Sequence, residues 1–202
     1  MLPNHRMRRL SRWLLTALLA LATGTAAAAE SRAIFAAGCF WCVEEAFDAV
    51  EGVTGTASGY VGGHVADPSY EEVTAGGTGH AEAVEVRFDS QHLDYRTLLD
   101  VFWRNVDPTD PGGQFCDRGD SYRSGIFPLD AEQERLARAS RQALKDDPEA
   151  PSPVVTEITR ADRFWPAEQY HQNYYRKNPL RYRFYKSACG RADRLEQLWG
   201  EG

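Results

Sequence analysis

The chain has 202 residues, of which 43% are hydrophobic and 11% aromatic, and its 23 basic and 29 acidic side chains give a formal net charge of −6. This length and composition predict one globular domain with its own core, and they exclude a largely disordered or repetitive chain. The negative charge argues against a protein that binds nucleic acid.

The first 29 residues have the pattern of a secretory signal peptide. An arginine-rich start is followed by the apolar run WLLTALLALA and by the small residues TAAAA, which end at Ala29. The apolar run is too short to cross a bilayer comfortably, so a retained anchor is the less favoured alternative. We expect residues 1–29 to be removed on export to the periplasm, leaving a domain at 30–202 without stable membrane insertion.

The first elements of this domain are a strand and a helix that meet at a cysteine. The apolar run in 31–38 predicts a buried strand ending at Gly38, and CFWCVEEAFDAV, residues 39–50, predicts a helix from its apolar spacing. Cys39 is therefore expected at a strand-to-helix turn. The glycines and proline of 52–79 predict a strand followed by a long loop.

The segment HAEAVEVRFD, residues 80–89, alternates between apolar and polar side chains and predicts a strand. Its apolar face carries Val84, Val86 and Phe88, and the same alternation places Glu82 on that face. A carboxyl group on a buried face must find hydrogen-bond donors or hold its proton near neutral pH. Glu82 is thus a candidate acid, although a carboxylate that reaches solvent at the strand's edge is an equal alternative.

The rest of the chain mixes helices, loops and strands without a strict strand-helix-strand rhythm, which predicts an α+β fold. Helices are expected at 94–105 and 130–147, and strands at the end of the loop 107–127 and at 153–161. Beyond residue 169 the sequence is basic and aromatic, with little regular signal before its last turns. In an acidic domain this segment is expected to wrap around the surface and pack its rings.

Four cysteines, Cys39, Cys42, Cys116 and Cys189, raise the question of redox chemistry. Cys39 at a helix start is expected to have a lowered pKa, because the helix N-terminus favours a thiolate. Cys42 stands three residues on, where the pair can form a redox-active CxxC or an ordinary disulfide. The other two cysteines stand alone, which argues against a zinc site, and no metal is expected.

Six ordered blocks between about Ser31 and Gly200 resemble the A-type peptide methionine sulfoxide reductases. The blocks are GCFWCVEEAF, GYVGG, PSYEEVTAGGTGHAEAVEVRFD, FWRNVDPTD, GQFCDRGDSYRSGIF and AEQYHQNYY. The resemblance implies a two-layer α+β sandwich around a mixed sheet, with a ferredoxin-like core and a long C-terminal tail. It also implies reduction of methionine S-sulfoxide, in proteins, peptides or free, by a thiol enzyme with no bound cofactor.

The resemblance gives roles to the candidate residues. Cys39 would attack the sulfoxide sulfur and become a sulfenic acid, while Glu82 would supply a proton to the oxygen. Tyr60 and Tyr122 match the family's hydroxyls that hold this oxygen. Substrate-binding residues are expected at three positions: Phe40, Trp41 and Asp117.

A second thiol must then resolve the sulfenic acid, and three cysteines compete for that role. Cys189 fits the usual position in the tail, Cys42 is nearest in sequence, and Cys116 lies in the loop that carries Tyr122. Cys189 is the expected one, because a tail moves more easily than a helix interior. A thioredoxin-like dithiol protein is the expected reductant, the targets are oxidised exported proteins, and the enzyme is expected to be a monomer.

Two rival functions use the same cysteines. A thioredoxin-like disulfide oxidoreductase would use Cys39 and Cys42 as its dithiol, but it would leave Glu82 without a purpose. A non-catalytic secreted domain would instead be stapled by disulfides Cys39–Cys42 and Cys116–Cys189, or would hold zinc.

Overall fold

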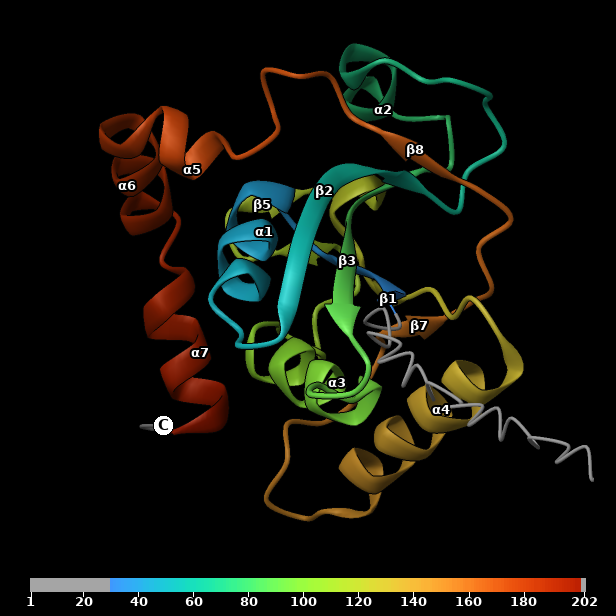
Figure 1. Cartoon of the computed structure of the whole chain (residues 1–202). Coiled ribbons are helices and arrows are strands. Elements are labelled where there is room, and N and C mark those ends of the chain that lie inside the picture. The colour runs from blue at the N-terminus through green and yellow to red at the C-terminus, as the bar shows by residue number, and fades with distance from the viewer. Residues whose placement is uncertain (1–29, 201–202) are drawn as a thin grey trace, which may run out of the picture.

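The computed structural model describes residues 30–200, which form a six-stranded sheet with helices packed against it (Figure 1). The predicted signal peptide, residues 1–29, lies outside the described residues. The strands are β1 (Glu30–Ala37), β2 (Val53–Val61), β3 (Ala81–Asp89), β4 (Gly113–Gln114), β5 (Asp117–Arg118), β6 (Ser124–Ile126), β7 (Glu157–Ile158) and β8 (Phe164–Pro166). The helices are α1 (Phe40–Asp48), α2 (Tyr70–Ala75), α3 (Tyr95–Arg104), α4 (Ala131–Asp146), α5 (Tyr174–Lys177), α6 (Pro179–Ala188) and α7 (Arg191–Trp199), with a 3₁₀ turn at Asp120–Tyr122.

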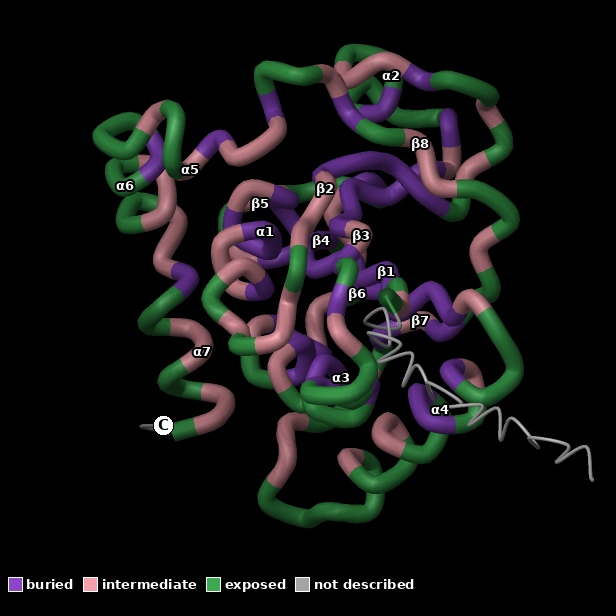
Figure 2. The backbone as a smooth tube through the Cα atoms, viewed as in Figure 1, coloured by how far each residue is buried: buried purple, intermediate pink, exposed green. Residues whose placement is uncertain are grey.

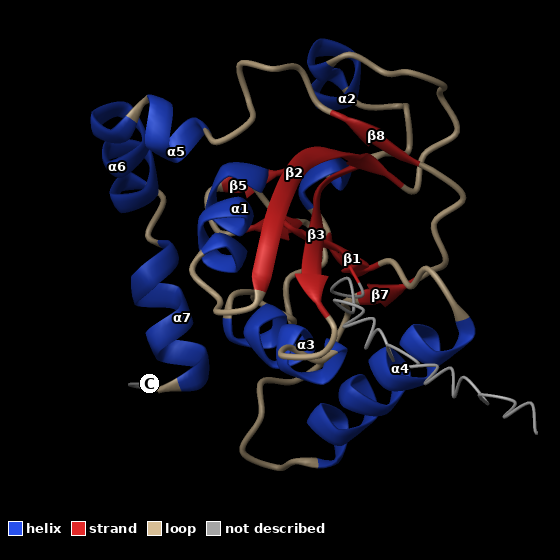
Figure 3. Cartoon of the chain, in the orientation of Figure 1, coloured by secondary structure: helices blue, strands red, loops and turns tan. Residues whose placement is uncertain are grey.

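The main sheet is mixed, in the order β7-β6-β1-β3-β2-β8, and the short pair β4-β5 forms a separate ribbon. Neighbouring strands are antiparallel except β6 and β7, which are parallel. Helices and strands are interspersed along the chain (Figure 3), and the α+β prediction is confirmed. The order β6-β1-β3-β2 of the central strands is compatible with the expected ferredoxin-like core, which stays a prediction.

The alternation of side chains in β1 divides the core between the two faces of the sheet. Phe35 belongs to the larger cluster, together with Phe47 of α1 and Leu98 of α3. Ile34 belongs to a smaller cluster on the other face, where Phe127 and neighbouring loop residues cover the sheet. The buried parts of the strands and of α1 and α3 form the centre of the molecule (Figure 2).

Two segments expected to be irregular contain helices. The segment 64–79 includes α2, which begins with a capping box in which the side chains of Ser69 and Glu72 bond to each other's backbone N–H. The tail contains α5, α6 and α7, which run beside α1 in Figure 1. Tyr174 and Tyr182 of the tail pack with Cys42, as the expected wrapping of aromatic rings requires. The strand expected at 153–161 is only the two-residue β7.

Among the described helices, none combines the length and the apolar character needed to cross a membrane.

Candidate active site

Cys39 lies where β1 gives way to α1, as the sequence predicts. β1 ends at Ala37, Gly38 turns the chain with φ +77°, and Cys39 is the N-cap of α1. A side chain at Gly38 would bring its Cβ within 2.6 Å of the Cβ of Gln114, so both the backbone angle and the space favour glycine. Cys39 is only 6% exposed. The turn therefore holds a thiol at the edge of the core.

A cavity of about 50 Å³ opens in front of this thiol. Its lining comes from α1, α2, β3, the ribbon β4-β5 with the turn that follows it, and the tail. The lining residues are Cys39, Phe40, Trp41, Tyr70, Glu82, Asp117, Tyr122 and Tyr185. The structure thus brings together segments far apart in sequence, and the cavity has room for the end of one side chain.

Glu82 points into this cavity from the buried face of β3 and is 2% exposed. Its Oε2 accepts a hydrogen bond of 3.1 Å from the backbone N–H of Phe40. Burial raises the pKa of Glu82 to about 8, although the Phe40 hydrogen bond opposes the shift; Asp117 adds to it. Glu82 therefore carries a proton at neutral pH and can act as an acid.

Three tyrosines line the cavity: Tyr70, Tyr122 and Tyr185. The side chains of Tyr70 and Tyr122 bond to each other; burial raises the pKa of Tyr70 to about 12 and raises that of Tyr122 as well, so both hydroxyls are protonated at neutral pH. The prediction of Tyr60 is wrong. Tyr60 lies opposite Glu82 in the sheet, but its hydroxyl donates to Glu168 at 2.8 Å and it does not line the cavity.

Tyr70 was missed because the sequence around it reads as a loop. The Ser69 and Glu72 pair that caps α2 is a signal that identifies a helix starting at Tyr70. Glu168 then fixes this helix from the tail, since its Oε1 accepts the backbone N–H of Tyr70 at 2.8 Å. One carboxylate therefore holds both tyrosines, Tyr60 through its hydroxyl and Tyr70 through its backbone.

The expected aromatic residues Phe40 and Trp41 both line the cavity. The Trp41 ring stacks on Tyr174, with 3.7 Å between ring centroids, and its Nε1 donates to Nδ1 of His171 at 3.1 Å. His171 is 2% exposed and packs against Phe40 as well. The tail therefore sets the position of the Trp41 ring.

Asp117 also lines the cavity, at the end next to the tail. It accepts a hydrogen bond of 2.5 Å from the hydroxyl of Tyr185, and the backbone N–H of Cys39 bonds to it as well. Burial raises the pKa of Asp117 against these hydrogen bonds. Tyr185 bonds to the Cys39 thiol too, which places Tyr185 between the two groups. Nothing in the sequence pattern singles out Tyr185 among the tail's rings.

The four cysteines divide into a free pair and a bonded pair. Cys39 and Cys42 are free and buried, whereas Cys116 and Cys189 form a disulfide across 73 residues. This arrangement does not match the stapled domain, which requires a Cys39–Cys42 bond. Cys189, expected in a mobile tail, ends α6 at an ordered turn instead.

The expectation that the helix start lowers the pKa of Cys39 is wrong, because burial dominates there. Burial raises the pKa of Cys39 well above its ordinary value, and its hydrogen bond to Cys42 and the nearby Glu82 raise it further. The pKa of Cys42 falls to about 7. The main cause is the hydrogen bond that the Cys39 thiol donates to it; burial opposes this shift, and the nearby Arg191 guanidinium adds to it. Within this pair, burial thus disfavours ionisation of Cys39, while the hydrogen bond from Cys39 favours ionisation of Cys42.

Metal ligands in the described part of the chain gather at Cys116, Asp117 and Cys189, whose ligand atoms lie within 4.8 Å of one another. Two of these three atoms are the sulfurs of the disulfide. A metal ion at this cluster requires the disulfide to be reduced first.

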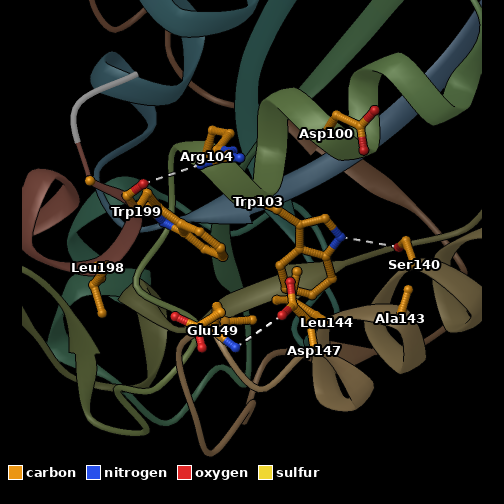
Figure 4. A pocket seen from close by; sticks show the side chains of 12 residues that line it. Asp100, Trp103, Arg104, Ser140, Ala143, Leu144, Asp147, Glu149, Leu198 and Trp199 are labelled. Carbon is orange, nitrogen blue, oxygen red and sulfur yellow. Dashed lines mark hydrogen bonds between the residues drawn. The ribbon is translucent and has the colours of Figure 1, made fainter.

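A larger cavity of about 770 Å³ lies elsewhere, between α3, the end of α4 and α7 (Figure 4). Trp103 and Trp199 face it; Trp103 donates to Ser140, and Arg104 donates to the backbone carbonyl of Trp199. No cysteine and no histidine lines this cavity. Its residues offer no thiol, so the small cavity at Cys39 is the candidate active site.

Comparisons with known proteins agree with this assignment. The family model described as peptide methionine sulfoxide reductase matches residues 31–202. The peptide methionine sulfoxide reductase MsrA of Bacillus pumilus is 48% identical over 172 residues, which are 85% of this chain and 97% of that protein.

Two solved structures of Mxr1 from Saccharomyces cerevisiae are also similar. The reduced form has a TM-score of 0.68 at 30% identity, covering 74% of this chain and 86% of that chain. Mxr1 in complex with Trx2 has a TM-score of 0.50 at 22% identity, covering 72% of this chain and 84% of that chain. The second likeness concerns the fold alone.

Proposed function

The chain belongs to the peptide methionine sulfoxide reductase family, and on that premise we propose that it reduces methionine sulfoxide to methionine. The observation that carries this function is the single small cavity where Cys39, Glu82, Tyr70 and Tyr122 meet. Reduction of a sulfoxide requires a nucleophile for the sulfur, an acid for the oxygen, and donors that stabilise the charge developing on that oxygen. The cavity offers all three.

The reaction follows from these positions. The sulfur of Cys39 attacks the sulfoxide sulfur while Glu82 gives its proton to the oxygen, and the thiol proton of Cys39 passes to Cys42. The oxygen then moves to the Cys39 sulfur: a new S–O bond forms there, while the S–S bond to the substrate and the original S–O bond of the sulfoxide break. Methionine leaves as a thioether, and Cys39 is left as a sulfenic acid. The methionine sulfur gains the electron pair that the Cys39 sulfur loses, so no bound cofactor is needed.

The substrate is the S epimer, as the family resemblance implies. The cavity supports discrimination because its lining is mixed: the rings of Phe40 and Trp41 suit the methyl group, while Glu82 and Tyr122 suit the oxygen. The rest of the methionine must lie toward the opening. Three different environments around one tetrahedral sulfur distinguish its mirror images.

The electron donor is a thioredoxin-like dithiol protein. Support comes from the complex of the yeast relative with Trx2 and from a reaction that leaves an oxidised thiol to be reduced. The arginine-rich, apolar start of the chain supports export to the periplasm, where the targets are oxidised exported proteins. The enzyme acts as a monomer, which size-exclusion chromatography with light scattering tests.

An assay with each epimer tests the function directly. The protein, a small dithiol and a peptide with methionine S-sulfoxide should yield methionine with many turnovers, and the R epimer should react at least about tenfold more slowly. Cys39→Ser should remove the activity. Equal rates on both epimers, or turnover by Cys39→Ser, would contradict the proposal.

The rival disulfide oxidoreductase is less well supported, although the pair Cys39 and Cys42 would serve it. Cys39 is 6% exposed and faces a cavity of about 50 Å³, which excludes a disulfide of a folded protein. The rival predicts rapid reduction of insulin by the same preparation.

A further inference from the structure

We propose that Cys116, Asp117 and Cys189 bind a divalent metal ion of the zinc type once the disulfide between the two cysteines is reduced. The two cysteines cross-link the oxidised protein and hold a metal ion in the reduced protein. Metal binding goes beyond the proposed function and does not depend on it. Its effect on catalysis, which acts through Asp117, rests on that function.

The three side chains meet from two distant parts of the chain. Cys116 lies in the turn between β4 and β5, Asp117 begins β5, and Cys189 is the C-cap of α6. Their ligand atoms lie within 4.8 Å of one another, with 4.0 Å between Sγ of Cys189 and Oδ2 of Asp117. A sulfur and an oxygen bound to one tetrahedral zinc ion lie about 3.6 Å apart. This pair is therefore already close to the spacing that a shared ion requires.

The two cysteines keep their places when their bond is broken, because separate elements hold their backbones. Their Cα atoms are 4.9 Å apart. Side-chain rotation can therefore bring the two sulfurs to the separation of about 3.8 Å that two thiolates have on one zinc ion. The backbone N–H of Cys116 also donates to Sγ of Cys189 at 3.2 Å. A hydrogen bond of this kind orients a metal-bound thiolate and stabilises its charge.

The kind of ligand favours zinc over magnesium or calcium, because thiolate sulfur is a soft ligand. Cys116 is exposed, so an ion can enter from solvent and a water molecule can complete the tetrahedron. Two thiolates and a carboxylate carry more negative charge than a divalent ion neutralises. The guanidinium of Arg191 lies near Asp117 and compensates the remainder.

The site forms by reduction followed by ligand exchange. A dithiol reductant supplies two electrons and two protons, the Cys116–Cys189 bond breaks, and the reductant becomes a disulfide. The metal ion then replaces both thiol protons, which pass to solvent. Binding should therefore weaken as the pH falls.

Asp117 connects this site to the substrate cavity, which it lines. Its Oδ2 accepts the hydroxyl of Tyr185 at 2.5 Å, and its side chain also accepts the backbone N–H of Cys39. A metal ion at Oδ2 competes with the Tyr185 hydroxyl for the same oxygen. Because Tyr185 also bonds to the Cys39 thiol, metal binding should disturb the groups around Cys39 and slow methionine formation.

The binding test uses the double variant Cys39→Ser and Cys42→Ser, whose remaining thiols are those of Cys116 and Cys189, and Co²⁺ as the probe. After reduction with a phosphine and desalting, this protein should bind one Co²⁺ per molecule and show a thiolate-to-cobalt charge-transfer band in the near ultraviolet. Zn²⁺ should displace the Co²⁺. The same protein with its disulfide intact should show no such band.

Asp117→Asn in this double variant should weaken Co²⁺ binding by at least about tenfold, because even the loss of an outer-shell partner usually costs about 10–100-fold. Asp120→Asn is the matched control, since Asp120 is an exposed carboxylate of the same loop outside the cluster. Zn²⁺ should also raise the midpoint of thermal unfolding of the reduced protein, which shows that the ion binds the folded state. A reduced protein without the band, or equal affinities in the Asp117 and Asp120 variants, would overturn the site.

The effect on catalysis is measured with Cys39 and Cys42 present. One equivalent of Zn²⁺ should slow single-turnover methionine formation several-fold in the phosphine-reduced wild type. It should act less on the wild type with its disulfide intact and on reduced Cys116→Ser. Equal inhibition of all three would place the inhibiting ion at Cys39 and Cys42 and overturn the connection through Asp117. An absence of methionine without Zn²⁺ would contradict the proposed function, while the Co²⁺ band decides the metal site independently.

Discussion

Glu82 shows how burial makes an acid out of a carboxylate. The hydrogen bond that it accepts from the backbone N–H of Phe40 favours the ionised form, but desolvation on the buried face of β3 favours the neutral form and prevails. The alternation of residues 80–89 was sufficient to predict this placement. The sequence could not show which partners Glu82 meets, because Phe40 is 42 residues away.

Glu82→Gln should slow methionine formation by at least about 100-fold, the lower end of the usual contribution of acid catalysis. The amide keeps the oxygen that accepts from Phe40 but cannot give a proton. In the wild type the rate should fall as the pH rises through about 8, because the protonated form is then lost. The rate of the Glu82→Gln variant should not show this fall with pH. Single-turnover rates from pH 6 to 10 provide the measurement.

Glu44→Gln is the matched control, since Glu44 is also a buried carboxyl group with a raised pKa but does not line the cavity. Glu44→Gln should have the single-turnover rate of the wild type and the same fall in rate above pH 8. A Glu82→Gln rate within about threefold of the wild type would remove Glu82 as the acid.

The tyrosines give a second test at the residue scale. Tyr70→Phe and Tyr122→Phe should each slow methionine formation about tenfold or more, because each removes a hydroxyl from the cavity. Tyr60→Phe should leave the chemical step nearly unchanged and cost about 1 kcal/mol of stability, because only the hydrogen bond to Glu168 is lost. Single-turnover kinetics and urea unfolding separate the effects. A slow chemical step in Tyr60→Phe alone would instead support Tyr60 as the hydroxyl that holds the sulfoxide oxygen.

At the scale of elements, the tail segment 168–173 joins α1, β2 and α2. Glu168 bonds to the backbone of Tyr70 in α2, and the Gln172 side chain bonds to the backbone N–H and carbonyl of Ser58 in β2. His171 accepts the Trp41 N–H, and Asn173 donates to Glu44 in α1. No residue of this segment lines the cavity, but its hydrogen bonds hold Tyr70 and Trp41, which do.

His171→Phe should raise KM for the sulfoxide about tenfold while kcat falls less, since the ring is kept and the acceptor for the Trp41 indole is lost. His171→Gln, whose amide oxygen can accept, should recover part of the affinity. Tyr175→Phe is the control, because Tyr175 bonds to Asp48 and not to Trp41. Steady-state kinetics on a sulfoxide peptide measure both constants. Equal changes in KM and in kcat in all three variants would contradict a role of His171 in positioning Trp41.

The elements that the sequence predicted well are those with a strong period. β1, β3, α3 and α4 follow from the alternation or the helical spacing of their apolar residues. The α2 helix was missed although its capping box was in the sequence, because glycine and proline around it dominate the local pattern. The tail helices were missed for another reason. Their apolar face is weak, and packing against α1 stabilises them more than local spacing does.

At the scale of the whole molecule, the C-terminal tail packs against the rest of the fold, and contacts of Cys189 and Arg191 hold its last part in place. Arg191 reaches the carbonyls at the ends of β1 and α3, and its guanidinium lies over the ring of Phe115. Cys189, two residues before it, is bonded to Cys116. No local pattern predicts this pairing, because it joins positions 73 residues apart and four cysteines allow three pairings.

The double variant Cys116→Ser and Cys189→Ser tests whether this disulfide is mainly a staple. A cross-link that closes a loop of this length restricts the unfolded chain and is worth up to about 4 kcal/mol. The variant should therefore unfold at lower denaturant concentration, and the wild type should approach the same midpoint once a reducing agent has opened the disulfide. Cys42→Ser is the control, since it leaves the staple in place. Because Cys116 is exposed at the surface, the same disulfide is accessible to a protein reductant. If the double variant is as stable as the wild type yet loses turnover with a thioredoxin-like protein while keeping it with a small dithiol, the pair serves electron transfer and the staple is secondary.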